Sequence, residues 1–582
     1  MSASSVSPSP ASPSTTSPPT ASSPTASSPT AVPRQQPLTG GGAIVAQLVR
    51  HGVDTVFGLP GVQTYSLFDA LGSADHLRLI NPRHEQGCSH MAFGAARSTG
   101  RPAVYTVVPG PGVLNSAAGL LGAYACNQPV LCITGQVPSS FLGRGRGHLH
   151  EMPDQLATLR GITKWCARIE RGSDAPTLVA QAFAAMTSGR QGPAALEMPW
   201  DVMDAPARAT PVEPVVTSTP PLDLSALDEA SAALARARRP MIFVGGGAID
   251  AADDIRRLAE LLGAPVVAFR SGRGIVAEDH PLGVSIVAAR RLWDTTDTFL
   301  AIGTRLELID WRWSWEPAGT TSIRIDIDGA EFARRPTTID VPADAGVAVR
   351  GLVALLERLP LHTEDRREEI AAAKADAARR IRTVQPQLDY LDVVREVLPR
   401  DAIICDELTQ VGLASWFGLP IYEPRTFLTS GYQGTLGSGF LTALGAKAVN
   451  PDRVVVSLTG DGGFLFGLQD LATAREHRLG VVTVVFNNGV YGNVMRDQHE
   501  RFGGRIVASH LHTPDLVALA RSFGVAAARA TSPAGLRTLL GQAVDSGEPW
   551  LIDVTIAPGS EANPWPFIHP PVGPHEPDGI PR

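Results

Sequence analysis

The sequence predicts an α/β protein with three doubly wound parallel-sheet domains, preceded by a disordered tail. Its 582 residues exceed what one hydrophobic core usually organises, so several domains are expected. From residue 40 onward, short apolar runs alternate with helical stretches, and these runs are continuous rather than interrupted by polar residues. Continuous apolar runs are typical of parallel strands covered by helices on both faces.

The first segment has a composition of its own. Residues 1–36 are almost entirely Ser, Pro, Thr and Ala, and no charge occurs before Arg34. Such a segment buries too little apolar surface to offset its ordering entropy, so we expect a disordered tail. It has neither the apolar run of a secretory signal nor the several arginines of a mitochondrial transit peptide.

Three α/β blocks of similar size follow this tail. A linker rich in Pro, Thr and Val (202–225) separates the first two blocks, and a charged helix from 364 to about 384 leads into the third. We expect domains at 37–200, 226–360 and 385–560, and a C-terminal tail at 561–582. Strands are expected at 55–57, 103–108, 129–133, 240–244, 264–269, 298–303, 322–327, 402–405, 453–458, 480–486 and 550–554.

Composition excludes several classes of protein. The net charge of −7 and a pI near 6.1 argue against nucleic acid or an anionic membrane as a partner. No run of about 18 apolar residues occurs, which argues against a membrane span. The five cysteines form no CxxC pair, so neither a disulfide framework nor a zinc knuckle is expected, and a cytoplasmic location fits best.

The most informative stretch is Thr459-Gly460-Asp461-Gly462-Gly463, which directly follows an expected strand. Asn488 comes 27 residues after Asp461, one βαβ crossover later, so both side chains are expected at the carboxyl edge of one sheet. A carboxylate, an amide oxygen and a backbone carbonyl are hard ligands that suit Mg²⁺. The glycines let backbone N–H groups approach a diphosphate. Either turn alone would be unremarkable; together they indicate a diphosphate–magnesium site.

This pattern resembles the thiamine diphosphate (ThDP)-dependent enzymes, and among them the acetolactate synthase-like group. Gly460-Asp461-Gly462, a 24-residue gap and Asn487-Asn488 match the family signature. The segments 83–97, 108–115, 134–138 and 431–437 match the group in order and spacing. The resemblance implies that Asp461 and Asn488 bind Mg²⁺ through side chains and Val490 through its carbonyl. It places these further residues at the cofactor: Gly460, Gly462, Gly463, Tyr491, Gly492 and Asn493.

Glu85, in Arg83-His84-Glu85-Gln86-Gly87, matches the glutamate that activates the cofactor in this family. A carboxyl group bonded to the aminopyrimidine promotes the tautomer that removes the thiazolium proton, and it does so better in a dry site. A solvated turn carboxylate is the alternative interpretation for a glutamate taken alone.

Further cofactor contacts are implied by two other motifs. Leu436 resembles the apolar residue that wedges between the cofactor rings, with Gly434 beside it offering a backbone contact. Thr409 and Gln410 fall where the group places polar contacts to the diphosphate, although polar residues after a strand are also common helix caps.

Three departures from the synthases concern the substrate and FAD. His150 stands where the synthases carry a glutamine, in a loop with His148, Arg144 and Arg146 that could bind a carboxylate and shuttle a proton; a solvated basic loop is the alternative. The synthases' tryptophan is missing near Asp497. In the middle domain, 306–311 replaces the run expected of FAD-dependent synthases, which argues against FAD.

We therefore expect a ThDP- and Mg²⁺-dependent enzyme that decarboxylates a pyruvate-like 2-oxo acid and ligates the enamine to a second carbonyl. The alternatives are a non-oxidative 2-oxo acid decarboxylase or C–C lyase, and a catalytically silent paralogue. The resemblance further implies pyrimidine-binding, central and diphosphate-binding domains. It also implies a homodimer or homotetramer with the active site at the subunit interface.

Overall fold

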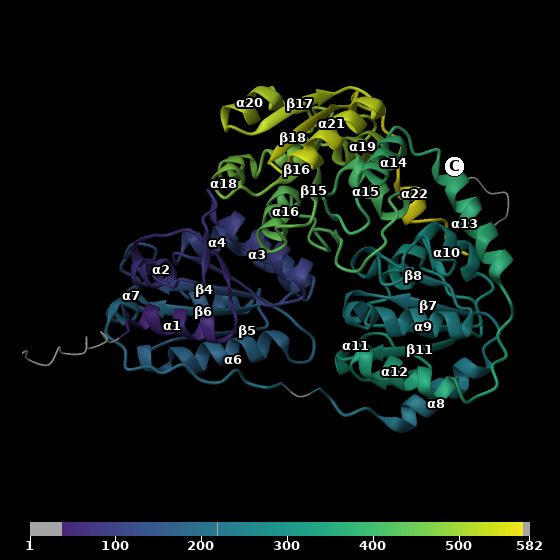
Figure 1. The fold of residues 1–582 in the computed structure, drawn as a ribbon, viewed down its shortest axis with the longest axis horizontal. Coiled ribbons are helices and arrows are strands. Elements are labelled where there is room, and N and C mark those ends of the chain that lie inside the picture. Colours follow the sequence, from purple (N-terminus) through teal and green to yellow (C-terminus); the bar gives the residue numbers. More distant parts are fainter. Residues whose placement is uncertain (1–37, 218, 574–582) are drawn as a thin grey trace, which may run out of the picture. The chain divides into compact units, whose positions relative to one another are not determined.

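The computed structural model describes residues 38–217 and 219–573. The predicted N-terminal tail and residues 574–582 of the predicted C-terminal tail lie outside these described residues. The described residues form three six-stranded sheets, and all strand pairs within them are parallel. Figure 1 shows the helices that flank these sheets. This arrangement confirms the predicted fold class.

The first sheet has the strand order β2-β1-β3-β4-β6-β5. Neighbouring residues of its strands face opposite sides: Val56 and Val104 pack with α1, α2 and α6, whereas Phe57 and Tyr105 pack with α3 and α4. Both faces are therefore covered, which explains the continuous apolar runs. The strands are β1 (Thr55–Gly58), β2 (Arg78–Ile80), β3 (Ala103–Val107), β4 (Val130–Gln136), β5 (Trp165–Arg168) and β6 (Ala194–Pro199). The helices are α1 (Gly40–Arg50), α2 (Tyr65–Gly72), α3 (Glu85–Thr99), α4 (Pro111–Ala125), α5 (Gln155–Arg160), α6 (Ala175–Thr187) and α7 (Trp200–Asp204).

The second sheet has the order β12-β11-β10-β7-β8-β9. The strands after β7 are first added on one side of it, as β8 and β9, and then on the other side, as β10 to β12. Its strands are β7 (Pro240–Val244), β8 (Val266–Ala268), β9 (Gly283–Val284), β10 (Thr298–Ile302), β11 (Thr321–Asp326) and β12 (Ile339–Pro342). Its helices are α8 (Leu224–Arg236), α9 (Ala252–Leu262), α10 (Ile286–Trp293), α11 (Gly329–Arg334) and α12 (Ala345–Leu356). The charged connecting segment forms α13 (Arg367–Ile381).

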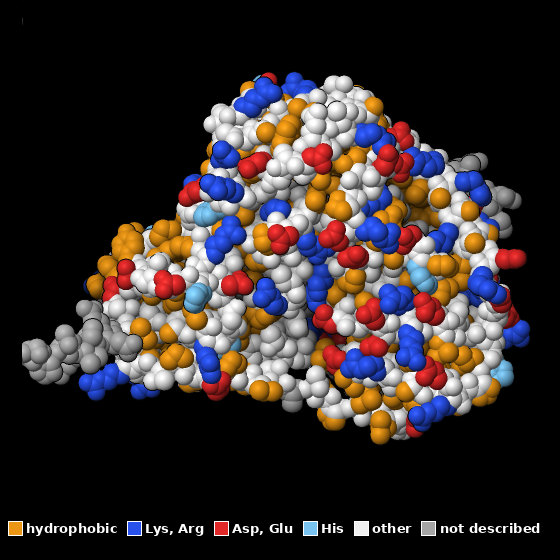
Figure 2. Space-filling model, in the orientation of Figure 1, with side chains coloured by type: hydrophobic (Ala, Val, Ile, Leu, Met, Phe, Trp, Pro, Cys, Tyr) orange, Lys and Arg blue, Asp and Glu red, His pale blue; other side chains and the backbone are white. Residues whose placement is uncertain are grey.

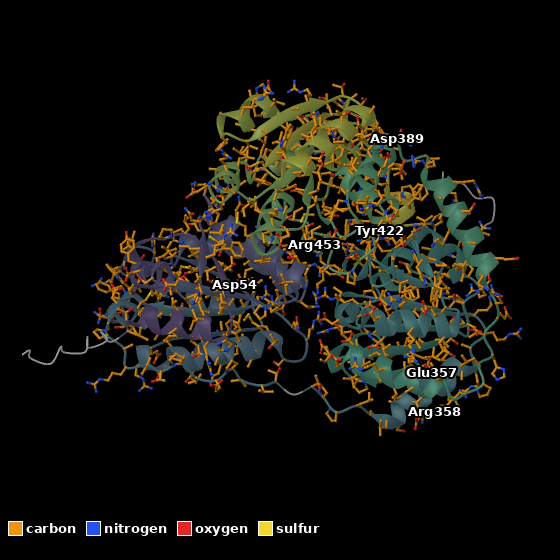
Figure 3. The ribbon with its side chains drawn as sticks, viewed as in Figure 1. Asp54, Glu357, Arg358, Asp389, Tyr422 and Arg453 are labelled. Carbon is orange, nitrogen blue, oxygen red and sulfur yellow. The ribbon has the colours of Figure 1, made fainter. Side chains whose placement is uncertain are left out.

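The third sheet has the order β14-β13-β15-β16-β18-β17, which sets β13, β15 and β16 side by side. Arg453, labelled in Figure 3, precedes β15, and its guanidinium donates to the carbonyl of Asp401 just before β13. The strands are β13 (Ile403–Asp406), β14 (Phe427–Leu428), β15 (Val455–Gly460), β16 (Val481–Asn487), β17 (Ala526–Ala530) and β18 (Trp550–Thr555). The helices are α14 (Gln387–Val397), α15 (Gln410–Gly418), α16 (Ser438–Val449), α17 (Asp461–Phe464), α18 (Leu471–Glu476), α19 (Gly492–Arg501), α20 (Leu516–Ser522), α21 (Pro533–Ser546) and α22 (Trp565–Ile568).

Residues 561–573, the first part of the predicted C-terminal tail, pack against the protein. The Gln387 side chain donates to the carbonyl of Ala562 at 2.6 Å, and Ile568 in α22 is fully buried. This segment therefore lies close to the carboxyl edge of the third sheet.

Two surface properties bear on partners. In the part of the chain that the structure describes, no helix has both the length and the apolar character needed to cross a bilayer. Figure 2 shows basic and acidic side chains interspersed over the visible face.

Candidate active site

Asp461 lies at the start of α17, immediately after β15, and its side chain is almost fully buried. Its Oδ2 accepts hydrogen bonds from Gly489 N (3.2 Å) and from the Thr513 hydroxyl. Burial raises the pKa of Asp461, and these donors only partly offset that effect. In the described residues, Asp461 forms no ion pair shorter than 4 Å, and such a buried carboxylate has the electrostatics expected of a metal ligand.

Asn488 follows β16 and is oriented by a residue that the sequence did not single out. Its Nδ2 donates to Glu561 Oε2 at 2.7 Å, while its Oδ1 accepts from Val490 N at 3.2 Å. Since Gly489 N reaches Asp461, the three predicted Mg²⁺ ligands gather at one sheet edge. A side chain that fixes the orientation of a ligand amide is a common feature of metal sites.

Gln410, the first residue of α15, lies beside these ligands. Its Oε1 accepts from Arg496 Nη1 at 2.7 Å, whereas its Nε2 is buried and has no hydrogen-bond partner among the described residues. A Cβ added to Gly492 would lie 3.2 Å from Asn488 Nδ2 and 3.8 Å from Gln410 Nε2, so both side chains face the same small space. An unpaired buried donor there suits an anionic ligand.

Other predicted cofactor residues have local structural roles that the structure makes visible. The Thr409 hydroxyl caps α15 by accepting from Gly412 N at 2.8 Å, which leaves its hydrogen free to donate elsewhere. The Tyr491 ring covers Gly462, and a Cβ there would lie 2.6 Å from the ring. Asn493 Oδ1 accepts from the Trp565 indole in α22. Gly460 lies against the methyl group of Thr409.

Glu85 is the first residue of α3, and its side chain is only 14% exposed. Its Oε2 accepts from Asn115 Nδ2 at 3.0 Å, so α4 fixes the carboxylate from the side. The preceding segment is held to the third domain, because Arg83 N donates to Asp470 Oδ1 at 2.8 Å. The predicted activating glutamate is therefore shielded and oriented.

His150 lies near Glu85, and the carboxylate's charge acts on the pKa of the imidazole. Gln63 Nε2 donates to Leu149 O, which turns Gln63 Oε1 toward His150 Nδ1 at 2.8 Å. Nδ1 is therefore the donor, and Nε2 is left to take up or release a proton. Burial lowers the pKa of His150 below its usual value, and Glu85 opposes that effect.

The backbone explains how this loop approaches the site. Gly110, which precedes α4, has φ +59°, and a Cβ there would lie 2.6 Å from His150 O. The Glu151 carboxylate accepts from Gly145 N and His148 N, so the loop is ordered by its own acidic residue. His148 stacks against Phe141 with ring centroids 4.6 Å apart.

The polar residues of the candidate site thus form two groups. One contains Glu85, Asn115 and His150, and the other contains Asp461, Asn488 and Gln410. Across the described ranges, no hydrogen bond or ion pair directly joins a member of one group to a member of the other. Gly434 (φ +59°) and the partly buried Leu436 lie in the loop before α16.

The chain matches one known protein family along most of its length. Three models of the thiamine pyrophosphate enzymes match the chain: the N-terminal TPP binding domain at 38–158, the central domain at 227–352 and the C-terminal TPP binding domain at 409–554. The chain belongs to the thiamine pyrophosphate enzyme family. Thiamine pyrophosphate is ThDP, so this match confirms the predicted family, and the protein is a ThDP-dependent enzyme.

Curated relatives of this thiamine pyrophosphate enzyme span most of its length. The "Probable acetolactate synthase large subunit" of Methanocaldococcus jannaschii is 34% identical, over 90% of this chain and 92% of that protein. The "Probable 2-ketoarginine decarboxylase AruI" of Pseudomonas aeruginosa is 36% identical, over 84% and 89%. The chloroplastic acetolactate synthase of Arabidopsis thaliana is 32% identical, over 90% and 82%. The chain is therefore similar to both synthases and a decarboxylase.

The residues present fit the family's cofactor. The unpaired Gln410 Nε2 and the Gly460–Gly463 turn at the start of α17 suit a diphosphate, and Asp461 with Asn488 and Val490 suits Mg²⁺. These assignments, like the roles of Thr409, Gly434, Leu436, Tyr491, Gly492 and Asn493, stay predictions.

A separate cavity of about 360 Å³ lies at the carboxyl ends of β7 and β10, and residues of the first domain, among them Asn127 and Arg190, line its other side. Gly245–Gly247, Thr304 and Arg305 line it. The 306–311 run, which departs from the FAD-dependent synthases, places Glu307 in ion pairs with Arg270 and Arg312. Nothing in the comparisons names FAD, and the argument against FAD stays a prediction.

Sequence reasoning missed four polar residues that hold the site together: Glu561, Arg496, Asn115 and Gln63. Glu561 falls in the segment predicted as a tail, so no motif marked it. Asn115 was noted only as part of a family segment, although an amide that contacts Glu85 across two helices has no periodic sequence signal.

Proposed function

We propose that this enzyme uses ThDP and Mg²⁺ to remove CO₂ from a 2-oxo acid. The bound cofactor supplies the electron sink for decarboxylation. Asp461, Asn488 and the Val490 carbonyl would hold the metal, and Gln410 would donate to the diphosphate. Glu85, fixed by Asn115, would bond the aminopyrimidine. Intact Glu85, Asp461 and Asn488 speak against a catalytically silent paralogue.

The position of His150 favours decarboxylation that ends in proton transfer. A glutamine, expected here in the synthases, cannot deliver a proton, whereas His150 can release one from Nε2 because Gln63 occupies Nδ1. His150 also lies within the electrostatic reach of Glu85. We therefore propose that the decarboxylated fragment is protonated and leaves as an aldehyde, and this observation carries the proposal.

Carboligation is the second candidate. It is favoured by similarity to acetolactate synthases over about nine-tenths of the chain. In that case the fragment would attack a second carbonyl, and the product would be a 2-hydroxy ketone. The synthase-type tryptophan is nevertheless missing at Asp497, so the acceptor site would differ.

NMR analysis of products separates the two candidates. The enzyme, ThDP and Mg²⁺ are incubated with single 2-oxo acids, including pyruvate and 2-ketoarginine, the compound in the name of the Pseudomonas relative. We expect aldehyde from wild type and, in His150→Gln, slower release with more ligated product. His76→Gln, at an exposed position, is the matched control. A 2-hydroxy ketone as the sole wild-type product would replace the decarboxylase proposal with carboligation.

We also propose that a second copy of the chain completes the site. α4 carries Asn115 and exposes an apolar stripe at helical spacing: Leu114 is 54% and Tyr124 47% exposed, and the exposed Ala118 and half-buried Leu121 lie between them. Such a stripe beside the Glu85 group suits burial in a homodimer. The homo-oligomer implied by the resemblance would bring the two residue groups together across this interface.

A further inference from the structure

Glu407 directly follows β13, and its buried carboxylate has no role in the proposed decarboxylation. Glu407 is 1% exposed. Its Oε1 accepts from Gly437 N, and its Oε2 accepts from the Thr459 hydroxyl. Gly437 ends the loop that carries Leu436, and Thr459 belongs to the strand that leads into Asp461. One side chain therefore bonds both segments.

The glycines around Glu407 fit this arrangement. A Cβ on Gly463 would lie 2.3 Å from Glu407 Oε1, and a Cβ on Gly439 would lie 3.2 Å from Glu407 Cβ. Gly463 must therefore lack a side chain because the carboxylate occupies that space. This is a second reason for the glycine, beside the predicted approach of its backbone to a diphosphate.

Burial of the Glu407 carboxylate costs free energy of folding. Burial raises its pKa to about 7, and the neighbouring Asp406 adds to the effect, with no cationic group opposing it. An apolar residue of similar shape would avoid that cost, since buried charges without partners destabilise a fold. Retention of a costly polar group between two cofactor-binding segments indicates a role in the site.

We propose that Glu407 is a positioning residue that clamps the Gly434–Gly437 loop to the Thr459–Gly463 turn. The clamp keeps a fixed spacing between the loop expected to hold the pyrimidine and the turn expected to hold the diphosphate and Mg²⁺. This inference rests on the proposed function, because it assigns both segments to one bound cofactor. Glu407 acts through backbone and hydroxyl groups rather than by touching the cofactor.

The adjacent Asp406 provides a matched control. It is equally buried, but its Oδ2 accepts from the Trp416 indole at 2.7 Å, and within the described residues its side chain makes no hydrogen bond to either clamped segment. Asp406→Asn retains an acceptor for Trp416 and should leave cofactor affinity unchanged. Any effect of simply changing a buried carboxylate would be shared by both positions.

The test measures ThDP affinity with saturating Mg²⁺ by calorimetry, and the melting temperature with and without cofactor. Glu407→Ala should weaken ThDP binding about 10–100-fold, the usual effect of removing a group that orients ligands. Glu407→Gln should stay within about threefold of wild type. Its amide can accept from Gly437 N and donate to Thr459, whose hydroxyl then donates to Gly460 O at 3.3 Å.

Thr459→Val breaks one side of the clamp without changing its size, and it serves if Glu407→Ala does not fold. Weaker ThDP binding in this variant, with cofactor-free melting unchanged, supports the clamp. The inference is overturned if Glu407→Ala and Thr459→Val lower the melting temperature but leave ThDP affinity unchanged. It is also overturned if Glu407→Gln loses affinity as Ala does. Failure of wild type to bind ThDP would instead refute the proposed function.

Discussion

The two carboxylates on which the site depends, Glu85 and Asp461, have contrasting surroundings. Asp461 is 1% exposed, accepts from Gly489 and Thr513, and lies beside Asn488 within its own domain. In the part of the chain that the structure describes, the Glu85 carboxylate has one hydrogen-bond partner, Asn115, and it lies beside a helix face that exposes Leu114. We propose that one chain supplies all the protein ligands of the metal, whereas the proposed pyrimidine side is completed by a second chain.

The comparison teaches which part of the chemistry each domain can support alone. The third domain presents a set of oxygen ligands and an unpaired amide donor, so it should bind diphosphate and metal by itself. The first domain holds Glu85 and His150, which lie within electrostatic reach of each other and which we propose act as acid and base only once the cofactor is bound. Substitutions at Glu85 should therefore affect kcat, whereas substitutions at Asp461 should affect cofactor binding.

The largest effect is expected from Glu85→Gln. Replacing the acid removes proton transfer to the aminopyrimidine, so kcat should fall about 10²–10⁴-fold. ThDP affinity should change little, because the metal side is untouched. Steady-state kinetics and calorimetric titration with ThDP check this prediction. A variant that loses affinity and keeps kcat would reverse the roles assigned to the two carboxylates.

Asp461→Asn should have the opposite profile. Loss of the charged ligand should weaken binding of Mg²⁺ and ThDP by at least about 10–100-fold. Without cofactor, however, the variant should melt no lower than wild type, because burial already raises the pKa of Asp461 and its charge is unfavourable there. Melting curves with and without Mg²⁺–ThDP measure both effects. Normal cofactor-induced stabilisation would exclude Asp461 as a metal ligand.

The exposed apolar face of α4 beside Glu85 predicts that the specific activity depends on the protein concentration. Leu114→Arg combined with Tyr124→Arg should place charge on the exposed stripe of α4 and dissociate the oligomer. Light scattering should show a lower mass, and specific activity should fall on dilution. Val216→Arg, at a 95% exposed linker position, is the control for added charge. An unchanged mass with full activity would place the interface elsewhere.

The sequence predicted the fold class and the cofactor family, because both depend on local signals. Continuous apolar runs marked the central strands, and strand-turn motifs marked Asp461 and Asn488. Seven strands were not predicted: β2, β5, β6, β9, β12, β14 and β17. Among these, β14 has only two residues, and β17 reads Ala-Ala-Ala-Arg-Ala, which favours a helix. Pairing with β18 overrides that preference.

The supporting residues of the site could not be predicted in the same way. Glu561 orients Asn488 from 73 residues away, and Gln63 orients His150 from 87 residues away. Such contacts depend on how elements pack rather than on spacing along the chain. Gly463 shows the same limit, since its motif indicated diphosphate approach while its missing side chain also makes room for Glu407.

The smallest expected effect concerns Asp470, which anchors the Glu85 segment to the third domain. Its Oδ1 accepts from Arg83 N and the Thr473 hydroxyl, and burial raises its pKa from 3.8 to about 6. The folded state therefore binds more protons than the unfolded state between these values. Stability from this group is present below pH 4 and is lost as the pH rises to about 6.

Asp470→Asn should remove the contribution of Asp470 to the pH dependence of the free energy of unfolding. This contribution amounts to at most about 3 kcal/mol. Asn retains an acceptor for Arg83 N, so the variant should be more stable than wild type at pH 7 and similar at pH 4. Urea unfolding across this range measures the difference, with the exposed Asp545→Asn as control. Asp406 and Glu407, with pKa values raised to about 6 and about 7, should leave a residual slope of the same sign. A variant less stable at pH 7 would mean that Asp470 is needed as a charged anchor, and that the Glu85 side is held by electrostatics rather than by hydrogen bonds.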